Sequence, residues 1–213
     1  MRRSSLLVLL LVCAVGASAA TVESILAASS RTLEGVRDFT CTMTFSVRST
    51  SVRVPESRAK IAYKVPDKFR AEPQDGDFAV LPSTWKFALG NTLQELREHT
   101  TMRLLREERL GERNQYVIRA DEKDSPGSYY LLWVDTERST LSAIRTYEPE
   151  MEPITMTMGY RREGRAWLPT VATMQAKVPG ADGQIEEMRA NLKLEGYRVN
   201  VGLTDAYFAE PQK

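Results

Sequence analysis

The sequence has very little of the side chains that catalyse reactions or hold metals. In 213 residues it contains two cysteines, Cys13 and Cys41, and a single histidine, His99. One histidine cannot form a histidine-rich metal site, and neither Cys-x-x-Cys nor His-Glu-x-x-His spacing occurs. A Gly-x-Ser-x-Gly elbow and a phosphate-binding glycine loop are also missing. We therefore expect no catalytic residues, no metal and no cofactor, and we do not expect an enzyme.

The sequence also lacks an excess of charge of one sign, because 29 lysines and arginines stand against 28 aspartates and glutamates. Along the chain no basic stripe separates from the acidic residues, so nucleic acid is not an expected partner. The apolar run from Leu6 to Val12 is far shorter than the roughly 20 residues that a membrane-spanning helix needs. We expect no transmembrane segment.

The N-terminus has instead the three parts of a secretory signal peptide. Arg2 and Arg3 give a basic start, the run 6–12 is apolar, and Ala17-Ser18-Ala19 fits the small-x-small cleavage rule. We expect residues 1–19 to be removed and residues 20–213 to form one periplasmic domain. Lipid attachment at Cys13 is the alternative, which is disfavoured because the preceding residue, Val12, is bulky where bacterial lipoproteins normally carry Gly, Ala or Ser.

Cleavage would leave Cys41 as the only cysteine, so no internal disulfide can form. Cys41 falls on the apolar face of an alternating segment in which Phe39, Met43 and Phe45 share that face. Free cysteine is among the most frequently buried residues. We therefore expect a core thiol rather than a nucleophile.

The periodicity predicts one helix followed by many strands. Thr21 is a suitable N-cap for a helix in which Val22, Ile25 and Leu26 recur at helical spacing, and Gly35 is expected to end it. A short second helix is expected from Asn91 to about His99. Strand patterns recur at 39–47, 58–64, 68–72, 102–109, 115–120, 129–135, 141–147, 154–160, 166–177, 184–194 and 197–201.

About ten or eleven strands after one helix predict a mainly β (α+β) fold. Antiparallel sheets pack one face and expose the other. We expect a curved antiparallel sheet that forms an incomplete barrel, with the N-terminal amphipathic helix and the short second helix covering its concave apolar face. The segment 129–135 is apolar on both faces and must be covered on both sides.

The order of these parts resembles a known family. Asp38-Phe39-Thr40 opens the first strand, Tyr63-Lys64-Val65-Pro66-Asp67-Lys68-Phe69-Arg70 ends the second and enters the third, Trp133-Val134-Asp135 follows, and Asn200 to Asp205 leads to Phe208. This resembles the LolA-like outer-membrane lipoprotein carrier superfamily. The resemblance implies an incomplete barrel closed by helices over a hydrophobic cavity, in proteins that carry lipoprotein acyl chains or bind other lipids. Related domains sense or recruit envelope proteins.

One position departs from that family. In the proteobacterial carriers an arginine directly before the proline ties down a helical lid, whereas this sequence has Val65. Control of the lid by that arginine is therefore absent or differently arranged here.

The resemblance and the apolar pattern predict a monomeric periplasmic carrier or binder of lipoprotein acyl chains or other lipids, which aids outer-membrane lipoprotein sorting. The alternative is an envelope sensor or adaptor with the same fold and a filled core, which binds a protein partner. Methionine adapts its shape, which suits variable acyl chains, but it also fills ordinary cores. The candidate ligand-binding residues are Phe39, Met43, Phe45, Ile61, Tyr63, Phe69, Met156, Met158, Met174 and Leu192.

Overall fold

A computed structural model of the chain describes residues 20–51, 53–74, 92–180 and 183–209. The predicted signal peptide, with Cys13, lies outside the described residues, as does the segment 75–91 before the second helix. No helix in the described ranges is long and apolar enough to cross a membrane.

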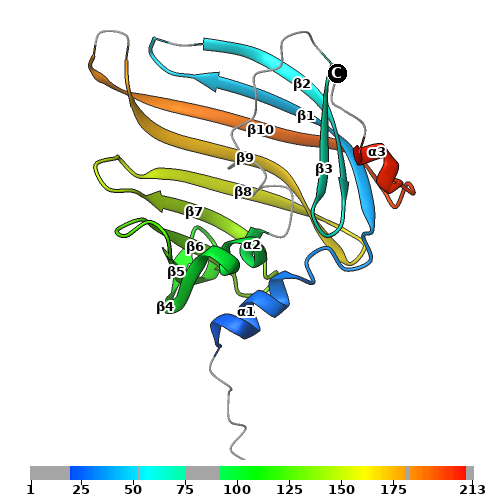
Figure 1. Cartoon of the computed structure of the whole chain (residues 1–213), viewed down its shortest axis with the longest axis horizontal. Helices are drawn as coiled ribbons and strands as arrows, with labels where there is room; N and C mark the ends of the chain where they lie inside the picture. The colour runs from blue at the N-terminus through cyan, green and yellow to red at the C-terminus, as the bar shows by residue number, and fades with distance from the viewer. Residues whose placement is uncertain (1–19, 52, 75–91, 181–182, 210–213) are drawn as a thin grey trace, which may run out of the picture.

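The described strands form one antiparallel sheet of ten, in the order β3-β2-β1-β10-β9-β8-β7-β6-β5-β4. β3 and β4 are its edges, so the sheet is curved but not closed (Figure 1). This confirms the predicted incomplete barrel. The strands are β1 (Asp38–Arg48), β2 (Arg53–Lys64), β3 (Lys68–Pro73), β4 (Thr100–Leu110), β5 (Arg113–Glu122), β6 (Tyr129–Asp135), β7 (Leu141–Tyr147), β8 (Ile154–Glu163), β9 (Ala166–Pro179) and β10 (Ile185–Val199).

The first and the last strand of the chain, β1 and β10, are neighbours in the interior of the sheet. β1 pairs with β2 on one side and with β10 on the other, while β4 to β10 form an uninterrupted meander. The segment that leads into β1 and the segment that leaves β10 are therefore close to each other. Asn200 bridges them, because its Oδ1 accepts from Arg37 N at 2.8 Å and its Nδ2 donates to Gly35 O at 2.9 Å.

The last strand differs from the prediction. Segments 184–194 and 197–201 were expected to be two strands, but β10 runs without a break from Ile185 to Val199. Its pairing with β1 shifts by one residue between Thr40 and Thr42, where Gly196 has a φ of 66°. A bulge of this kind needs a residue that tolerates positive φ. The glycine therefore bends one strand instead of separating two.

Three helices accompany the sheet: α1 (Val22–Ser29), α2 (Thr92–His99) and α3 (Asp205–Ala209). α1 begins with a capping box, in which Ser24 N donates to Thr21 Oγ1 at 3.2 Å and Thr21 N donates to Ser24 Oγ at 3.0 Å. It is shorter than predicted, since residues 30–35 form turns. A helix extending to Gly35 was therefore wrong.

α1 and α2 lie over the β4–β5 end of the concave face (Figure 1). Ile25 and Leu26 of α1 are each 4% exposed, and Leu93 and Leu96 of α2 are buried in the same apolar cluster. Both helices are held to the sheet by an apolar stripe, as an amphipathic helix should be.

The convex face of β6 is partly covered by side chains of neighbouring strands. Tyr129 stacks on Tyr147 with the ring centroids 4.5 Å apart, and the Arg119 guanidinium lies 3.6 Å from the Tyr129 ring centroid. Trp133 Nε1 donates to Glu108 Oε1 at 2.6 Å. The concave-face residues Leu132 and Val134 are buried, whereas Tyr129, Leu131 and Trp133 on the convex face are only partly buried, so the expected cover on both sides is incomplete.

Candidate functional site: the concave apolar face

The concave face carries one continuous apolar cluster to which all ten strands and the helices α1 and α2 contribute. The structure brings all ten predicted ligand-binding residues into it. Eight of them are buried, and two, Phe69 and Met174, are only partly buried. The buried eight are Phe39, Met43, Phe45, Ile61, Tyr63, Met156, Met158 and Leu192.

Strand register explains why these side chains meet. Successive strand residues point to opposite faces, so alternate residues of each strand share the concave face. Phe45 is directly opposite Leu192 across the β1–β10 pair, and Tyr63 is opposite Phe69 across the β2–β3 pair. On the other side of the sheet Met156 is opposite Met174. The cluster is thus built from cross-strand pairs, the basic unit of sheet packing.

Aromatic rings occupy the end of the cluster where β1 begins. The Phe39 ring lies 5.2 Å from the Tyr63 ring and 5.2 Å from the Tyr197 ring, measured between centroids. Cys41 lies beside them on the same strand face and is 4% exposed, which confirms the predicted core thiol. Burial raises the pKa of the Cys41 thiol to about 12, although a hydrogen bond with Tyr197 opposes the shift. A thiol that is protonated at neutral pH is a poor nucleophile.

Two tyrosines that the sequence analysis left out of the site also belong to the concave face. Tyr160 OH donates to Leu141 O at 3.0 Å, and Tyr197 OH donates to Pro169 O at 2.6 Å. Burial raises the pKa of both phenol groups. Tyr160 could have been found from the alternation Met156, Met158, Tyr160 in β8. With their hydroxyls bound to backbone carbonyls, both rings add apolar surface.

Two hollows of about 200 Å³ each lie away from these ten residues. One lies between α1 and the strands β5 and β6, next to Ile25, Tyr116 and Val134. The other is on the convex face of β7 to β10. Within the described ranges no group of three or more His, Cys, Asp or Glu side chains is placed to hold a metal ion. The concave face itself presents apolar side chains.

No protein-family model matches the sequence, and a search of curated proteins finds no match either. Solved structures do match. A DUF1329 family protein from Desulfovibrio piger superposes with a TM-score of 0.61 at 15% identity, over 88% of this chain and 96% of that one. A LolA superfamily protein from Nitrosomonas europaea gives a TM-score of 0.58 at 14% identity, over 90% and 99%. The fold is LolA-like.

A third structure supports the same fold. A domain of a candidate outer-membrane lipoprotein-sorting protein from Vibrio parahaemolyticus gives a TM-score of 0.57 at 14% identity, over 88% of this chain and 95% of that one. None of the three similar proteins is named as an enzyme. The likeness in each case covers nearly the whole of both chains, so it concerns the complete curved sheet.

In this LolA-like fold the turn that contains Val65 holds the C-terminal helix. Val65 itself is 40% exposed. The lysines on either side of the turn bind one carboxylate, with Lys64 Nζ 2.7 Å from Asp205 Oδ1 and Lys68 Nζ 2.7 Å from Asp205 Oδ2. Arg70 NH1 also donates to Tyr207 O at 2.6 Å. Two lysines that bind α3 thus flank the position where the carriers that this sequence resembles have an arginine.

These lysines lower the pKa of Asp205 from 3.8 to about 2, chiefly through the hydrogen bond from Lys64. A carboxylate whose pKa is lower in the folded state stabilises that state above its unfolded pKa, and the contribution disappears as the pH falls through the folded value. We expect the attachment of α3 to be intact above about pH 4 and to be lost as the pH falls toward 2.

This expectation is tested by comparing wild type with Asp205→Asn, which cannot titrate, in urea unfolding at a series of pH values. Wild type should have the higher free energy of unfolding at neutral pH. This difference should vanish near pH 2, where the Asp205 carboxylate of the folded protein takes up a proton. A difference that stays constant from neutral pH to pH 2 would contradict attachment of α3 through the ionised Asp205 carboxylate.

Proposed function

We propose that the protein binds a lipid, or the acyl chain of a lipoprotein, against the concave face of its sheet. The observation that carries the proposal is the continuity of this face. The ten predicted ligand-binding residues come from six strands and form part of one apolar cluster in an open LolA-like sheet. An apolar face that is not sealed by closure of a barrel is suited to an apolar ligand.

Methionine gives this face the ability to change shape. Met43, Met156, Met158 and Met174 all belong to the cluster, with Met156 and Met174 directly opposite each other. An unbranched thioether side chain repacks at low cost. Burial of an acyl chain is worth about 0.8 kcal/mol per methylene, so about twelve methylenes gain about 10 kcal/mol before the costs of ordering.

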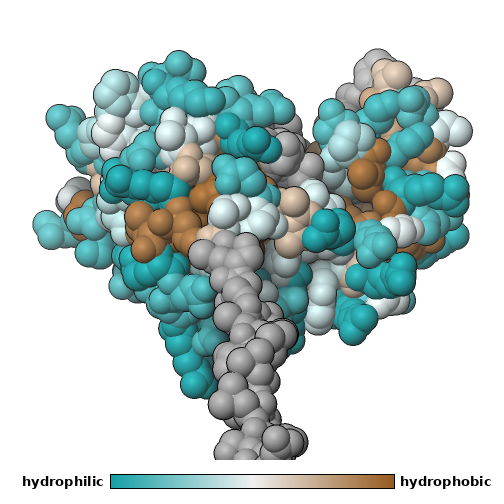
Figure 2. Space-filling view, turned by 90° about the horizontal axis from the view of Figure 1, so that it is seen from below, coloured by the Kyte–Doolittle hydropathy of each residue, from teal (hydrophilic) through white to brown (hydrophobic). Residues whose placement is uncertain are grey.

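Apolar surface reaches the outside of the molecule at the α3 end, where we place the entry. Val65 is 40% exposed and Val201 38% exposed, and both are close in sequence to the residues that hold α3. Seen from the side of α1, the surface is mostly hydrophilic, with apolar residues gathered beside the start of α1 and at the α3 end (Figure 2). Phe69, one of the two partly buried candidates, lies in β3 just after the turn that contains Val65.

We place this activity in the periplasm, in a monomeric domain of residues 20–213 released from its signal peptide. The likeness to a candidate outer-membrane lipoprotein-sorting domain supports a role in outer-membrane lipoprotein sorting. The binding involves no covalent step, because its energy comes from burial of methylenes.

The test compares two glutamate substitutions at neighbouring residues of β9. Met174 belongs to the concave cluster and is only partly buried, while Gln175 is exposed on the convex face. Met174→Glu is expected to abolish lipid loading, because a carboxylate next to an acyl chain loses its hydration. Gln175→Glu adds the same charge and is expected to load as wild type does. Loading is measured by native mass spectrometry of protein purified from a bacterial periplasm, followed by lipid extraction.

Equal loading of wild type and Met174→Glu would contradict a ligand on this face. A wild-type protein that carries no lipid and takes up neither offered phospholipid nor offered lipopeptide would overturn the proposal. It would favour the adaptor with a filled core. Circular dichroism of Met174→Glu confirms that a loss of loading is not a loss of folding.

A further inference from the structure

The register of the sheet assembles a row of arginines on the convex face, opposite to the proposed lipid site. Nine residues, one from each strand except β3, lie directly opposite one another in succession. Six of the nine are arginines and none is acidic. In spatial order the residues of this arginine row are Arg53, Arg48, Arg189, Gln175, Thr155, Arg145, Leu131, Arg119 and Arg103.

Most of these arginines form no ion pair among the described residues, although Glu187 lines the convex hollow together with Arg189. Arg119 has one, since its NH2 lies 2.7 Å from Asp121 Oδ1. In the part of the chain that the structure describes, no ion pair is found for Arg48, Arg53, Arg103 or Arg189. Arg48 is directly opposite both Arg53 and Arg189, although like charges in opposite positions destabilise a sheet.

This row does not reflect a generally basic protein. The chain has a formal net charge of +1, so positive charge on the row is balanced by acidic residues elsewhere. Along the chain no basic stripe separates from the acidic residues. The six arginines come from six strands, and the antiparallel register alone places them in line.

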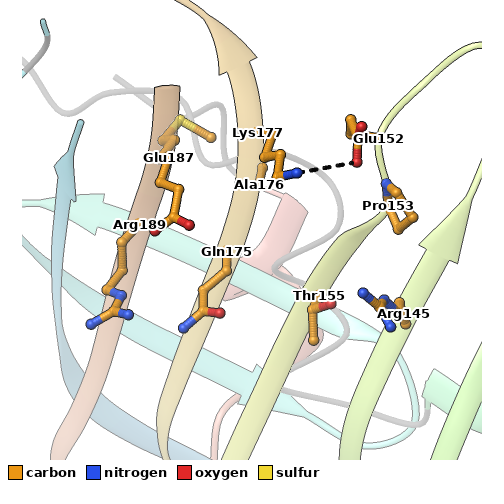
Figure 3. A pocket seen from close by; sticks show the side chains of 10 residues that line it. Arg145, Glu152, Pro153, Thr155, Gln175, Ala176, Lys177, Glu187 and Arg189 are labelled. Atoms are coloured by element: carbon orange, nitrogen blue, oxygen red, sulfur yellow. Dashed lines mark ion pairs between the residues drawn. The ribbon is translucent and has the colours of Figure 1, made fainter. Parts of the chain in front are cut away.

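The convex hollow lies in the middle of the row. It has a volume of about 200 Å³, and Arg145, Thr155, Gln175 and Arg189 line it from four adjacent strands. Figure 3 shows these four side chains at one level, with the Lys177–Glu152 ion pair of 3.8 Å and Glu187 at the next level. Arg145 and Arg189 thus lie at the two ends of the hollow, with the polar side chains of Thr155 and Gln175 between them.

We propose that the arginine row binds an acidic, extended segment of a protein partner. Strands lie about 4.8 Å apart, so nine strands span roughly 38 Å, which suits about eleven extended residues. Guanidinium groups bind carboxylates through two parallel hydrogen bonds. The row follows the curve of the sheet, so a flexible chain can contact all of it, whereas a flat membrane touches only its middle.

The neighbouring positions leave room for such a segment. On one side of the row, Ser46, Asn191, Thr173 and Thr157 lie directly opposite one another in succession. Their side chains are small or uncharged. A backbone can therefore lie along this strip while its carboxylates reach the arginines.

The test measures binding of a fluorescein-labelled peptide of about twelve residues that alternates Glu and Ser. Fluorescence anisotropy is recorded for the purified protein at low and high salt. We expect wild type to bind, and the double variant R48Q/R189Q to bind about tenfold more weakly. The matched control R58Q/R161Q removes two exposed arginines outside the row, each paired with a glutamate, and should change the affinity less than about twofold.

The melting temperature of R48Q/R189Q gives an independent readout, since removal of the opposed charges should leave it no lower than that of wild type. Absence of peptide binding by wild type at low salt overturns the proposal. Equal weakening in both double variants also overturns it, because binding would then follow total charge. Binding to phosphatidylglycerol vesicles without binding to the peptide assigns the row to a membrane surface instead.

Discussion

Replacement of Phe39 by alanine is expected to lower the free energy of unfolding by about 3–5 kcal/mol. Phe39 is fully buried and lies near the start of β1, an interior strand that pairs with both β2 and β10. Its ring contacts Tyr63 and Tyr197, each at 5.2 Å between centroids. Alanine removes a whole ring from a site whose walls are three hydrogen-bonded strands, so the cavity cannot close.

Urea unfolding followed by tryptophan fluorescence and circular dichroism measures this loss. Phe39→Leu keeps much of the volume and is expected to cost less than about 1.5 kcal/mol. Val201→Ala, at a side chain that is 38% exposed, serves as the control and should stay within about 0.5 kcal/mol of wild type. Similar unfolding energies for Phe39→Ala and Val201→Ala would mean that the ring cluster contributes little to the core.

Alternation along the sequence predicted the concave face well. In β1 the pattern from Phe39 to Val47 gives the face of every residue, because the side-chain period of a strand is two. Phe45 and Leu192 each follow from the alternation in their own strand, and the pairing of β1 with β10 brings them opposite each other. Ten of the eleven expected segments correspond to strands of the structure, and the eleventh is the end of β10.

Contacts that depend on register or on the chain ends could not be predicted in this way. A single bulge at Gly196 decides which residue of β10 faces which residue of β1, and a periodic pattern does not reveal it. The arginine row depends on eight strand pairings at once. The attachment of α3 depends on the ion pairs of Lys64 and Lys68 with Asp205, which is more than 130 residues away along the chain.

Removal of the Asp38 carboxylate is expected to release the C-terminal segment. Asp38 is 4% exposed, and its oxygens accept from Gly202 N at 3.2 Å and from Leu203 N at 3.2 Å. Hydrogen bonds to a charged group contribute about 1.5–3 kcal/mol. Asp38→Ala should therefore lower the free energy of unfolding by about 2–3 kcal/mol, as measured in urea.

Hydrogen exchange distinguishes release of this segment from general destabilisation. In Asp38→Ala the amides of residues 203–209 should exchange much faster than in wild type, while the amides of β8 and β9 keep their protection. Asp67→Ala, at an exposed carboxylate on the turn between β2 and β3, is the control and should leave both regions unchanged. If the amides of 203–209 exchange equally in wild type and Asp38→Ala, the contacts that Lys64, Lys68 and Arg70 make with this segment hold α3 without Asp38. The role of Asp38 would then be confined to the start of β1.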